Sequence, residues 1–374
     1  MKIDNNAFFE ELFSYYNFNL DKFIGYKTVA KGHINTTYTL YFDYGNKVKR
    51  FLLQEINTNV FKNEKQLMNN ISKITTYYEK QLKKTNYKNY KNKVLRIHKT
   101  KDKKSYVTLK NNSVWRIYHY IENSTSFDIS KSEKIFYESG KVIGNFHNIL
   151  KNFDYYTLDE TIKDFHNTPK RFDFFIETLN NCNKELLNKC KDEIDFFKKN
   201  TAIPFQIQHF IDKNIMPIRI THNDTKLNNI MFEYGSNKGL CLVDLDTIMP
   251  GCICFDYGDF IRSACSLASE DEKDLSKVVF QKDSFLNFTK GFLEKMKNIS
   301  EIELTNLING ALTMIYECGM RFLTDYLNNN VYFKIDYDNQ NLDRCKTQIH
   351  LYKQILLEKE NLENKVIEIK KSLG

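Results

Sequence analysis

The first third of the chain alternates hydrophobic and polar positions in a way that predicts strands around one helix. Residues 37–42, TYTLYF, alternate at the period of a strand, and FDYGNK then supplies a hairpin turn into a second strand at residues 48–56. Residues 60–78 place apolar side chains at the spacing of an amphipathic helix. Further strands are predicted at residues 94–98, 105–110 and 113–121, with a turn at Asn111-Asn112 between the last two.

After about residue 120 the pattern becomes helical. Helices are predicted at residues 131–151, 171–198, 256–268, 275–297, 303–328 and 341–372. Between them lies a short β-like island formed by PIRITHND, IMFEY and LCLVDLD. We therefore predict an α+β chain with two lobes: a small antiparallel β-sheet lobe with one helix at residues 1–118, and a larger, mostly helical lobe at residues 119–374.

Composition narrows the classes of protein that the chain can represent. Its 374 residues are 41% hydrophobic, with 29 Phe and 23 Tyr, which is enough for a sizeable core. The net charge of +8 is spread along the chain, so we expect a solvated surface and no nucleic-acid partner. No apolar run reaches the roughly 20 residues that span a bilayer, and the N-terminus lacks the apolar core of a signal peptide. The eight Cys show no paired metal-ligand spacing. We expect free thiols in a cytoplasmic protein, with no membrane contact and no obligate protein partner.

The densest polar cluster is THNDTKLNNIMF at residues 221–232. From His222 to Asn229 it has the spacing H-x-D-x-x-x-x-N of a kinase catalytic loop, in which the Asp accepts the proton of the attacking hydroxyl and the Asn binds magnesium. Those positions are Asp224 and Asn229. The apolar run ending at Val243 leads directly into Asp244, a suitable second magnesium ligand. The alternative is that these side chains only cap turns. We expect His222 to hold the loop backbone.

With these residues in view, the sequence resembles the aminoglycoside phosphotransferase and choline kinase superfamily, which has a protein-kinase-like fold. Within it the sequence is most similar to N-acetylhexosamine 1-kinases. The similar stretches include GHINTTY (32–38), LLQEINTNVFKN (52–63), WRIYHYIENSTSFD (115–128), DFHNTPKR (164–171), THNDTKLNNIMF (221–232), LVDLDTIMPG (242–251), FDYGDFIRS (255–263), RFLTDYLNNNVYFK (321–334) and NLDRCKTQ (341–348).

This resemblance implies ATP and Mg²⁺ as cofactors, Asp224 as the catalytic base, and Asn229 and Asp244 as metal ligands. It places the ATP phosphates on the strand–turn segment that contains Gly32, Asn35, Thr36 and Thr37. It also implies a hinge whose backbone contacts adenine, at Tyr118, Tyr120 and Ile121. Asp259, early in a predicted helix, is expected to support the catalytic loop.

One position departs from the wider kinase pattern. The strand residue that usually supplies a phosphate-binding Lys is Gln54, and an amide cannot neutralise phosphate charge. Either the protein is an inactive nucleotide-binding pseudokinase, or another cation compensates. Lys226, two residues after Asp224, is the candidate that we consider, and the resemblance favours an active enzyme.

The resemblance suggests His33, His166, Arg321 and Tyr332 as contacts of the acceptor sugar. Arg321 could instead pair with Glu317 one helical turn away, and Tyr332 could belong to the core. Two roles remain open for Asp246: it could contact the substrate or the metal, or it could cap the turn.

The leading hypothesis is thus an ATP-dependent kinase that phosphorylates the anomeric hydroxyl of an N-acetylhexosamine, a small-molecule sugar substrate. An aminoglycoside, choline or other small-alcohol kinase is the first alternative. A catalytically inactive nucleotide-binding protein is the second. The basic candidate contacts favour a neutral sugar, because cationic acceptors are bound by acids or aromatic cages.

Overall fold

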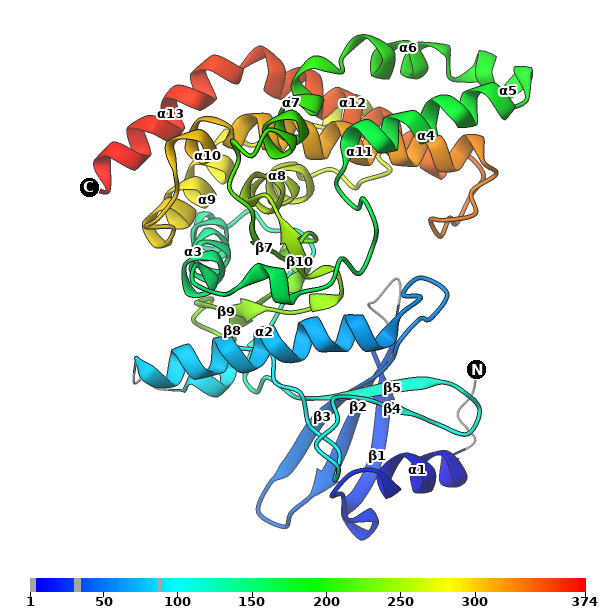
Figure 1. Cartoon of the computed structure of the whole chain (residues 1–374), viewed down its shortest axis with the longest axis vertical. Coiled ribbons are helices and arrows are strands. Elements are labelled where there is room, and N and C mark those ends of the chain that lie inside the picture. The colour runs from blue at the N-terminus through cyan, green and yellow to red at the C-terminus, as the bar shows by residue number, and fades with distance from the viewer. Residues whose placement is uncertain (1–4, 30–34, 86–88) are drawn as a thin grey trace. The chain divides into compact units, whose positions relative to one another are not determined.

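A computed structural model of the chain describes residues 5–29, 35–85 and 89–374. It divides into two compact units, Met1–Asn123 and Ser124–Gly374. The domain boundary expected at 118/119 falls inside a strand, β5 (Val114–His119). We describe each unit separately, with the labels of Figure 1.

The first unit is built on a five-stranded antiparallel sheet with strand order β1-β2-β3-β5-β4. Besides β5, its elements are α1 (Asn5–Ser14), η1 (Leu20–Lys22), β1 (Phe23–Thr28), β2 (Thr36–Asp43), β3 (Val48–Glu55), α2 (Glu64–Lys84), η2 (Tyr90–Asn92) and β4 (Val107–Thr108). The hairpin between β2 and β3 turns at Gly45, whose φ of 77° suits glycine, and Asp43 Oδ1 accepts a hydrogen bond from its N–H. The segment predicted as a strand at residues 94–98 forms only an isolated bridge, Ile97 with Tyr118.

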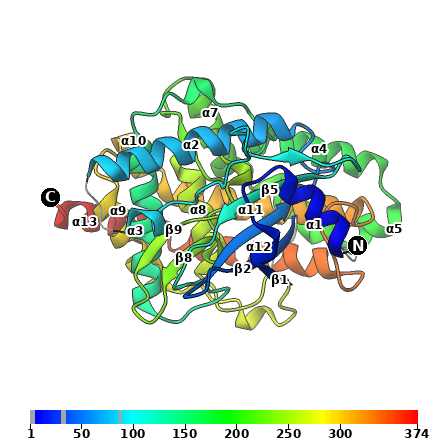
Figure 2. The ribbon, with the colours of Figure 1, turned by 90° about the horizontal axis from the view of Figure 1, so that it is seen from below.

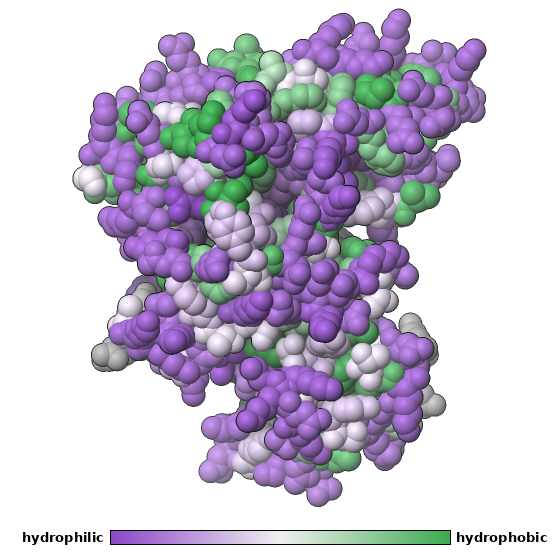
Figure 3. All heavy atoms as spheres, viewed as in Figure 1, coloured by the Kyte–Doolittle hydropathy of each residue, from purple (hydrophilic) through white to green (hydrophobic). Residues whose placement is uncertain are grey.

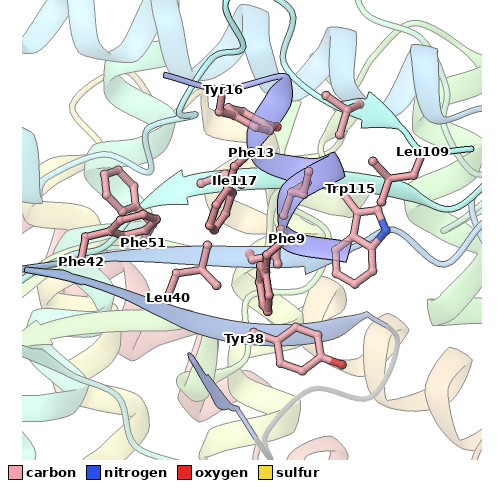
Figure 4. Close-up of a cluster of buried hydrophobic side chains, with 13 residues drawn as sticks. Phe9, Phe13, Tyr16, Tyr38, Leu40, Phe42, Phe51, Leu109, Trp115 and Ile117 are labelled. Atoms are coloured by element: carbon pink, nitrogen blue, oxygen red, sulfur yellow. The ribbon is translucent and has the colours of Figure 1, made fainter. Parts of the chain in front are cut away.

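Helix α1 and strand β1 were absent from the sequence-based prediction, yet they complete the core of this unit. Phe9 and Phe13 of α1 are buried against the sheet residues Leu40, Phe42 and Ile117. Figure 4 shows these side chains gathered between α1 and the strands. An α1 of ten residues is too short to be stable alone, so burial of its aromatic face fixes it. Such burial stabilises by about 1.5–3 kcal/mol for each large side chain.

The second unit is mostly helical, and its short strands form two small sheets, β6-β8-β9 and β7-β10. Its strands are β6 (Ser124–Thr125), β7 (Arg219–Thr221), β8 (Ile230–Glu233), β9 (Gly239–Leu242) and β10 (Met249–Gly251). Its α-helices are α3 (Glu133–Leu150), α4 (Thr168–Asn181), α5 (Lys184–Lys189), α6 (Lys191–Lys199), α7 (Ala202–Asp212), α8 (Ile253–Ala264), α9 (Lys282–Lys295), α10 (Glu301–Thr305), α11 (Leu307–Leu327), α12 (Gln340–Leu357) and α13 (Lys359–Ser372). Its short 3₁₀ helices are η3 (Tyr155–Thr157), η4 (Leu227–Asn229), η5 (Leu245–Thr247) and η6 (Leu275–Lys277).

Glycines allow helices α3 and α9 to pack closely; both are labelled in Figures 1 and 2. A Cβ added at Gly291 of α9 would lie 1.9 Å from the backbone oxygen of Tyr137, and one at Gly140 of α3 would lie 2.1 Å from that of Phe288. The buried helix α11 runs through the centre of this unit, with nearly all of its side chains covered. The two units thus confirm an α+β architecture with an antiparallel N-terminal sheet and a mostly helical remainder.

The single helices predicted at 171–198 and 341–372 are interrupted. The first becomes α4, α5 and α6, because Asn183 caps a new helix by accepting from the N–H of Glu185. The second divides at Glu358 into α12 and α13. Hydrophilic side chains dominate the face shown in Figure 3. No described helix is long and apolar enough to cross a membrane.

Candidate active site

The segment with kinase-like spacing forms a loop between β7 and η4, and buried groups hold its backbone. The carboxylate of Asp256, in the first turn of α8, accepts from the N–H of His222 at 2.8 Å and from that of Asn223 at 2.7 Å. The Thr225 hydroxyl donates to the Asp256 carbonyl at 2.6 Å. Asn223 has a φ of 64°, a left-handed conformation that Asn tolerates better than most residues. Three positions of the loop, 222, 223 and 225, are thereby fixed before any side chain acts on a ligand.

A buried histidine supports Asp256 in turn. His147 of α3 places Nε2 2.9 Å from Asp256 Oδ2, and neither side chain is exposed. Burial raises the pKa of Asp256, but His147 and the backbone N–H donors lower it by more, so the net pKa is lowered. The carboxylate therefore stays ionised and keeps both backbone hydrogen bonds.

The structure places His222 as a support of the loop. Its Nε2 lies 2.9 Å from the Val243 carbonyl, while the N–H of Asp224 donates to its Nδ1 at 3.3 Å. In this arrangement Nε2 donates and Nδ1 accepts. His222 thus links the candidate base to the strand end that precedes Asp244.

Asp224 lies among groups that keep it ionised. Asn229 Nδ2 donates to its carbonyl at 2.8 Å and to Oδ2 at 3.0 Å, and Lys226 Nζ lies 3.1 Å from Oδ1. Burial raises the pKa of Asp224, but the Lys226 ammonium and other nearby positive charges together lower it by more, so the net pKa is lowered. The Asp224 carboxylate in turn raises the pKa of Lys226. Twenty-eight per cent of the Asp224 side chain remains exposed, so it can meet a ligand.

The two candidate metal ligands have suitable donor chemistry. Because Asn229 uses its Nδ2 for both bonds to Asp224, its Oδ1 is left for a cation. Asp244 follows β9 in a left-handed conformation, with φ of 60° and ψ of 61°. One amide oxygen and one carboxylate are the hard oxygen donors that Mg²⁺ prefers. Groups of three or more His, Cys, Asp or Glu able to hold a metal are absent from the described residues, so this pair needs further oxygens from a ligand or water.

The candidate acceptor residues of the second unit lie in and beside α11. The Arg321 guanidinium stands over three aromatic rings, with its carbon 5.5 Å from the Phe165 centroid and 5.6 Å from those of Tyr332 and Phe333. Arg321 also donates to the Tyr332 hydroxyl at 3.4 Å. The alternative pairing of Arg321 with Glu317 does not occur among the salt bridges of the described residues.

A buried carboxylate positions two of these rings. Asp325 accepts from the N–H of Tyr332 at 2.8 Å and from that of Phe333 at 2.9 Å. Tyr332 remains 57% exposed, so it is not a core residue.

His166 occupies a different environment from that of a sugar contact. Its Nδ1 lies 2.8 Å from Glu317 Oε1, and its Nε2 lies 3.3 Å from the Asn223 carbonyl. Both partners are acceptors, so both bonds form together only when the imidazole carries a proton on each nitrogen. The Thr168 hydroxyl donates to the other Glu317 oxygen at 2.8 Å. No ring nitrogen remains for a sugar hydroxyl, and His166 instead joins α11 to the loop.

Other predicted site residues have more varied positions. Gly32 and His33 lie outside the described residues. Asn35 accepts from the N–H of Asn57 at 3.0 Å, and Thr36 begins β2. Asp246 is 4% exposed within η5. Asp259, expected to support the catalytic loop, instead pairs with Arg262 at 2.9 Å, and Asp256 has the expected role.

The predicted hinge residues lie at the end of β5. Tyr118 and Ile121 are buried, while the Tyr120 ring stacks under the Arg50 guanidinium at 4.1 Å. Arg50 is also paired with Glu122.

A cavity of about 350 Å³ in the second unit lies apart from these residues. His147, Tyr155 and Arg219 are among its lining residues, whereas none of the candidate base or metal residues is.

The profile of the phosphotransferase enzyme family matches residues 94–274. An ethanolamine kinase of Plasmodium vivax is similar in structure, with a TM-score of 0.54 and 13% identity over 88% of this chain and 82% of its own. A choline kinase of Cryptosporidium parvum Iowa II gives 0.52 and 14% over 96% and 95%. A spectinomycin phosphotransferase bound to ADP and spectinomycin gives 0.50 and 13% over 97% and 98%.

The chain has the kinase-like phosphotransferase fold. The family match includes the whole segment with kinase-like spacing, Asp244 and Asp256. Sequence reasoning missed Asp256 and His147, although the former lies in the quoted stretch FDYGDFIRS, two residues after the buried Cys254.

Proposed function

We propose that the protein transfers the γ-phosphoryl group of ATP to the anomeric hydroxyl of an N-acetylhexosamine, giving the sugar 1-phosphate. The observation that supports it most is the Asp224 carboxylate, ionised, partly exposed and held by Asn229 and Lys226. A carboxylate in this state can accept the proton of a neutral hydroxyl as that hydroxyl attacks. Its position is fixed through the backbone bonds to Asp256.

The metal and nucleotide complete this proposal. Asn229 and Asp244 would hold Mg²⁺, which when bound neutralises charge on the transferring phosphate oxygens. Lys226, at 3.1 Å from Asp224, would donate to the γ-phosphate and keep the base oriented. Within the first unit, we propose Thr36, Thr37 and Gln54 as contacts of nucleotide phosphates and the backbone at Tyr118 to Ile121 as a contact of adenine.

The surroundings of Arg321 support a neutral acceptor. Proteins bind quaternary ammonium groups with cages of aromatic rings. Here the rings of Phe165, Tyr332 and Phe333 already surround the chain's own cation. A cationic acceptor would therefore meet a guanidinium, whereas sugar hydroxyl and acetamido oxygens can accept its hydrogen bonds. We propose Arg321 and Tyr332 as sugar contacts, with Asp246 and His33 as further candidates.

The alternative of a cationic or small-alcohol acceptor is motivated by the similar solved structures, which are an ethanolamine kinase, a choline kinase and a spectinomycin phosphotransferase. Incubation with Mg-ATP and a panel of N-acetylglucosamine, N-acetylgalactosamine, choline, ethanolamine and aminoglycosides distinguishes the acceptors through ADP release. We expect release only with the N-acetylhexosamines. Release with choline or an aminoglycoside alone would reject the sugar assignment. If the protein binds ATP but releases ADP with none of the acceptors, the inactive nucleotide-binding alternative would be supported.

The role of Asp224 has its own test. We expect Asp224→Asn to lower kcat by at least about 10²-fold with little change in ATP affinity, because a general base contributes about 10²–10⁴-fold. Asp173→Asn, on the exposed face of α4, is the matched control and should keep wild-type turnover. An Asp224→Asn enzyme with near wild-type kcat would refute the assignment.

A further inference from the structure

Gln54 stands where a phosphate-binding Lys is usual in kinases, and the structure places a buried cation directly beside it. Gln54 and Arg116 are cross-strand partners in β3 and β5. Arg116 Nε donates to Gln54 Oε1 at 3.1 Å. The Arg116 side chain is 1% exposed, so its charge acts in a region of low dielectric.

Further contacts fix the position of the Arg116 guanidinium within the first unit. Its NH1 lies 3.7 Å from Met68 Sδ of α2, and its carbon lies 5.2 Å from the Tyr118 ring centroid. The same cation thus contacts the helix behind the sheet and the neighbouring strand. A charge held at this depth has little freedom to move toward solvent.

The bond from Arg116 also decides which way the Gln54 amide faces. With Oε1 held by the guanidinium, Nε2 points the other way and donates to Thr37 Oγ1 at 3.1 Å. Thr37 pairs with Gln54 across β2 and β3. Gln54 then retains one amide N–H, and the Thr37 hydroxyl retains its own hydrogen after accepting a bond. Both are hydrogen-bond donors, the groups that phosphate oxygens require.

We propose that Arg116 replaces the usual phosphate-binding Lys indirectly: it orients and polarises Gln54, which with Thr37 binds the phosphate oxygens of the nucleotide. This inference rests on the proposed use of ATP. It also explains why position 54 is an amide. A Lys at position 54 would place an ammonium beside the buried guanidinium, where like charges repel strongly. Arg116 is therefore a positioning residue, and Gln54 and Thr37 are the contacts.

The test is a double-mutant cycle in which the positive charge is removed at position 116, added at position 54, or moved from one to the other. ADP affinity is measured for each variant. Arg116→Met should weaken ADP binding by roughly 10- to 100-fold, the range expected when hydrogen bonds assisted by a charge are lost. Gln54→Lys alone should weaken it by at least about 10-fold through repulsion. The double variant Gln54→Lys/Arg116→Met has one cation at this position, and its ADP affinity should return to within about threefold of wild type. Gln54→Met should weaken binding as Arg116→Met does.

Titration calorimetry with Mg-ADP measures this binding without an acceptor. Lys49→Met is the matched control, since Lys49 lies on the same strand as Gln54, is exposed with its ammonium over the Tyr44 ring, and should not affect ADP affinity. Trp115, the only Trp of the chain and a neighbour of Arg116, reports by fluorescence whether each variant is folded.

Unchanged ADP affinity in folded Arg116→Met, or the absence of rescue in a folded double variant, would overturn the inference. If Arg116→Met does not fold, Gln54→Met and the double variant decide. If the wild-type protein binds no ADP, the proposed function fails as well. Wild-type binding of ADP without phosphorylation of any sugar would refute only the proposed reaction.

Discussion

His166 offers a sharp distinction between a residue that binds substrate and one that holds the structure. Replacing it by Phe keeps an aromatic ring but removes both ring nitrogens. The substitution leaves the Glu317 carboxylate, which is 1% exposed, with only the Thr168 hydroxyl among its described side-chain partners. Removing one partner of a buried ion pair destabilises proteins by about 3–5 kcal/mol. We therefore expect the free energy of unfolding in urea to fall by about 3 kcal/mol.

The kinetic consequence follows from the second ring nitrogen. Loss of the bond to the Asn223 carbonyl removes one of the contacts that hold the residue preceding Asp224. We expect kcat to fall more than the acceptor KM rises, because the proposed base loses its alignment while the proposed sugar contacts remain. Thr168→Val is the matched control: it removes one hydrogen bond to the same carboxylate, should lower stability by about 1.5–3 kcal/mol, and should leave kcat close to wild type.

The refuting result for His166→Phe is equally specific. A sugar contact would give a raised acceptor KM, an unchanged kcat and an unchanged urea midpoint. Nuclear magnetic resonance of the histidine rings supplies a readout independent of activity. Both ring nitrogens of His166 should show hydrogen bonding, to Glu317 and to the Asn223 carbonyl, and a ring nitrogen without a hydrogen bond would contradict the assignment.

Two further predictions concern stability. Burial lowers the pKa of His98 and of His119 from 6.5 to about 4 in the folded protein, with neighbouring cations adding to the effect. Between pH 6.5 and 4 the unfolded chain therefore binds protons that the folded unit does not, so stability is lost as the pH falls through this window. One unit of pKa shift corresponds to about 1.36 kcal/mol. After a reduction of this value for partial solvent screening, each imidazole accounts for a loss of about 2 kcal/mol in the free energy of unfolding. Trp115 fluorescence during urea unfolding should show this loss, and replacing both His by Phe should flatten it; an equally steep loss would contradict the assignment. Separately, Gly291→Ala should destabilise the protein by about 3 kcal/mol, because the new Cβ meets a backbone oxygen of α3 that cannot move independently. Lys290→Ala, on the exposed side of α9, should change the urea midpoint little, and equal midpoints for the two variants would refute the close packing of these helices.

Local patterns in the sequence predicted much of the architecture. Strands β2, β3 and β5 and helices α3, α8 and α11 lie where periodicity placed them, because each has one apolar face or a continuous apolar run. Helix α1 was missed because the reason for its stability is tertiary. Its aromatic side chains become informative only once the sheet that they cover exists.

In the candidate site, too, local sequence patterns predicted some residues, whereas residues that depend on tertiary contacts were missed. The spacing from His222 to Asn229 was sufficient to predict the candidate catalytic loop, since the kinase pattern places the proposed base and metal ligand within a few residues of each other. The groups that hold the loop come from α3, α8 and α11, at distances along the chain that no local pattern reveals. His147 lies 2.9 Å from Asp256 in space, but more than a hundred residues away in sequence. For His166, a family-based expectation identified an important residue, but the contacts of its two nitrogens indicate a different role.

The surroundings of Gln54 show why a motif position cannot be interpreted alone. Lys226 was the only candidate cation that the loop sequence suggested, and its ammonium lies against Asp224. The cation beside Gln54 comes from the neighbouring strand and is brought there by sheet register. Alternation along β5 puts Arg116 on the same face as Tyr118 and Val114, a pattern that alone predicts a buried apolar position. A buried guanidinium on that face is stable only with hydrogen-bond acceptors, and the Gln54 oxygen is one of them. The amide at position 54 and the cation at position 116 therefore constrain each other, so a change at either one should be tolerated only together with a change at the other.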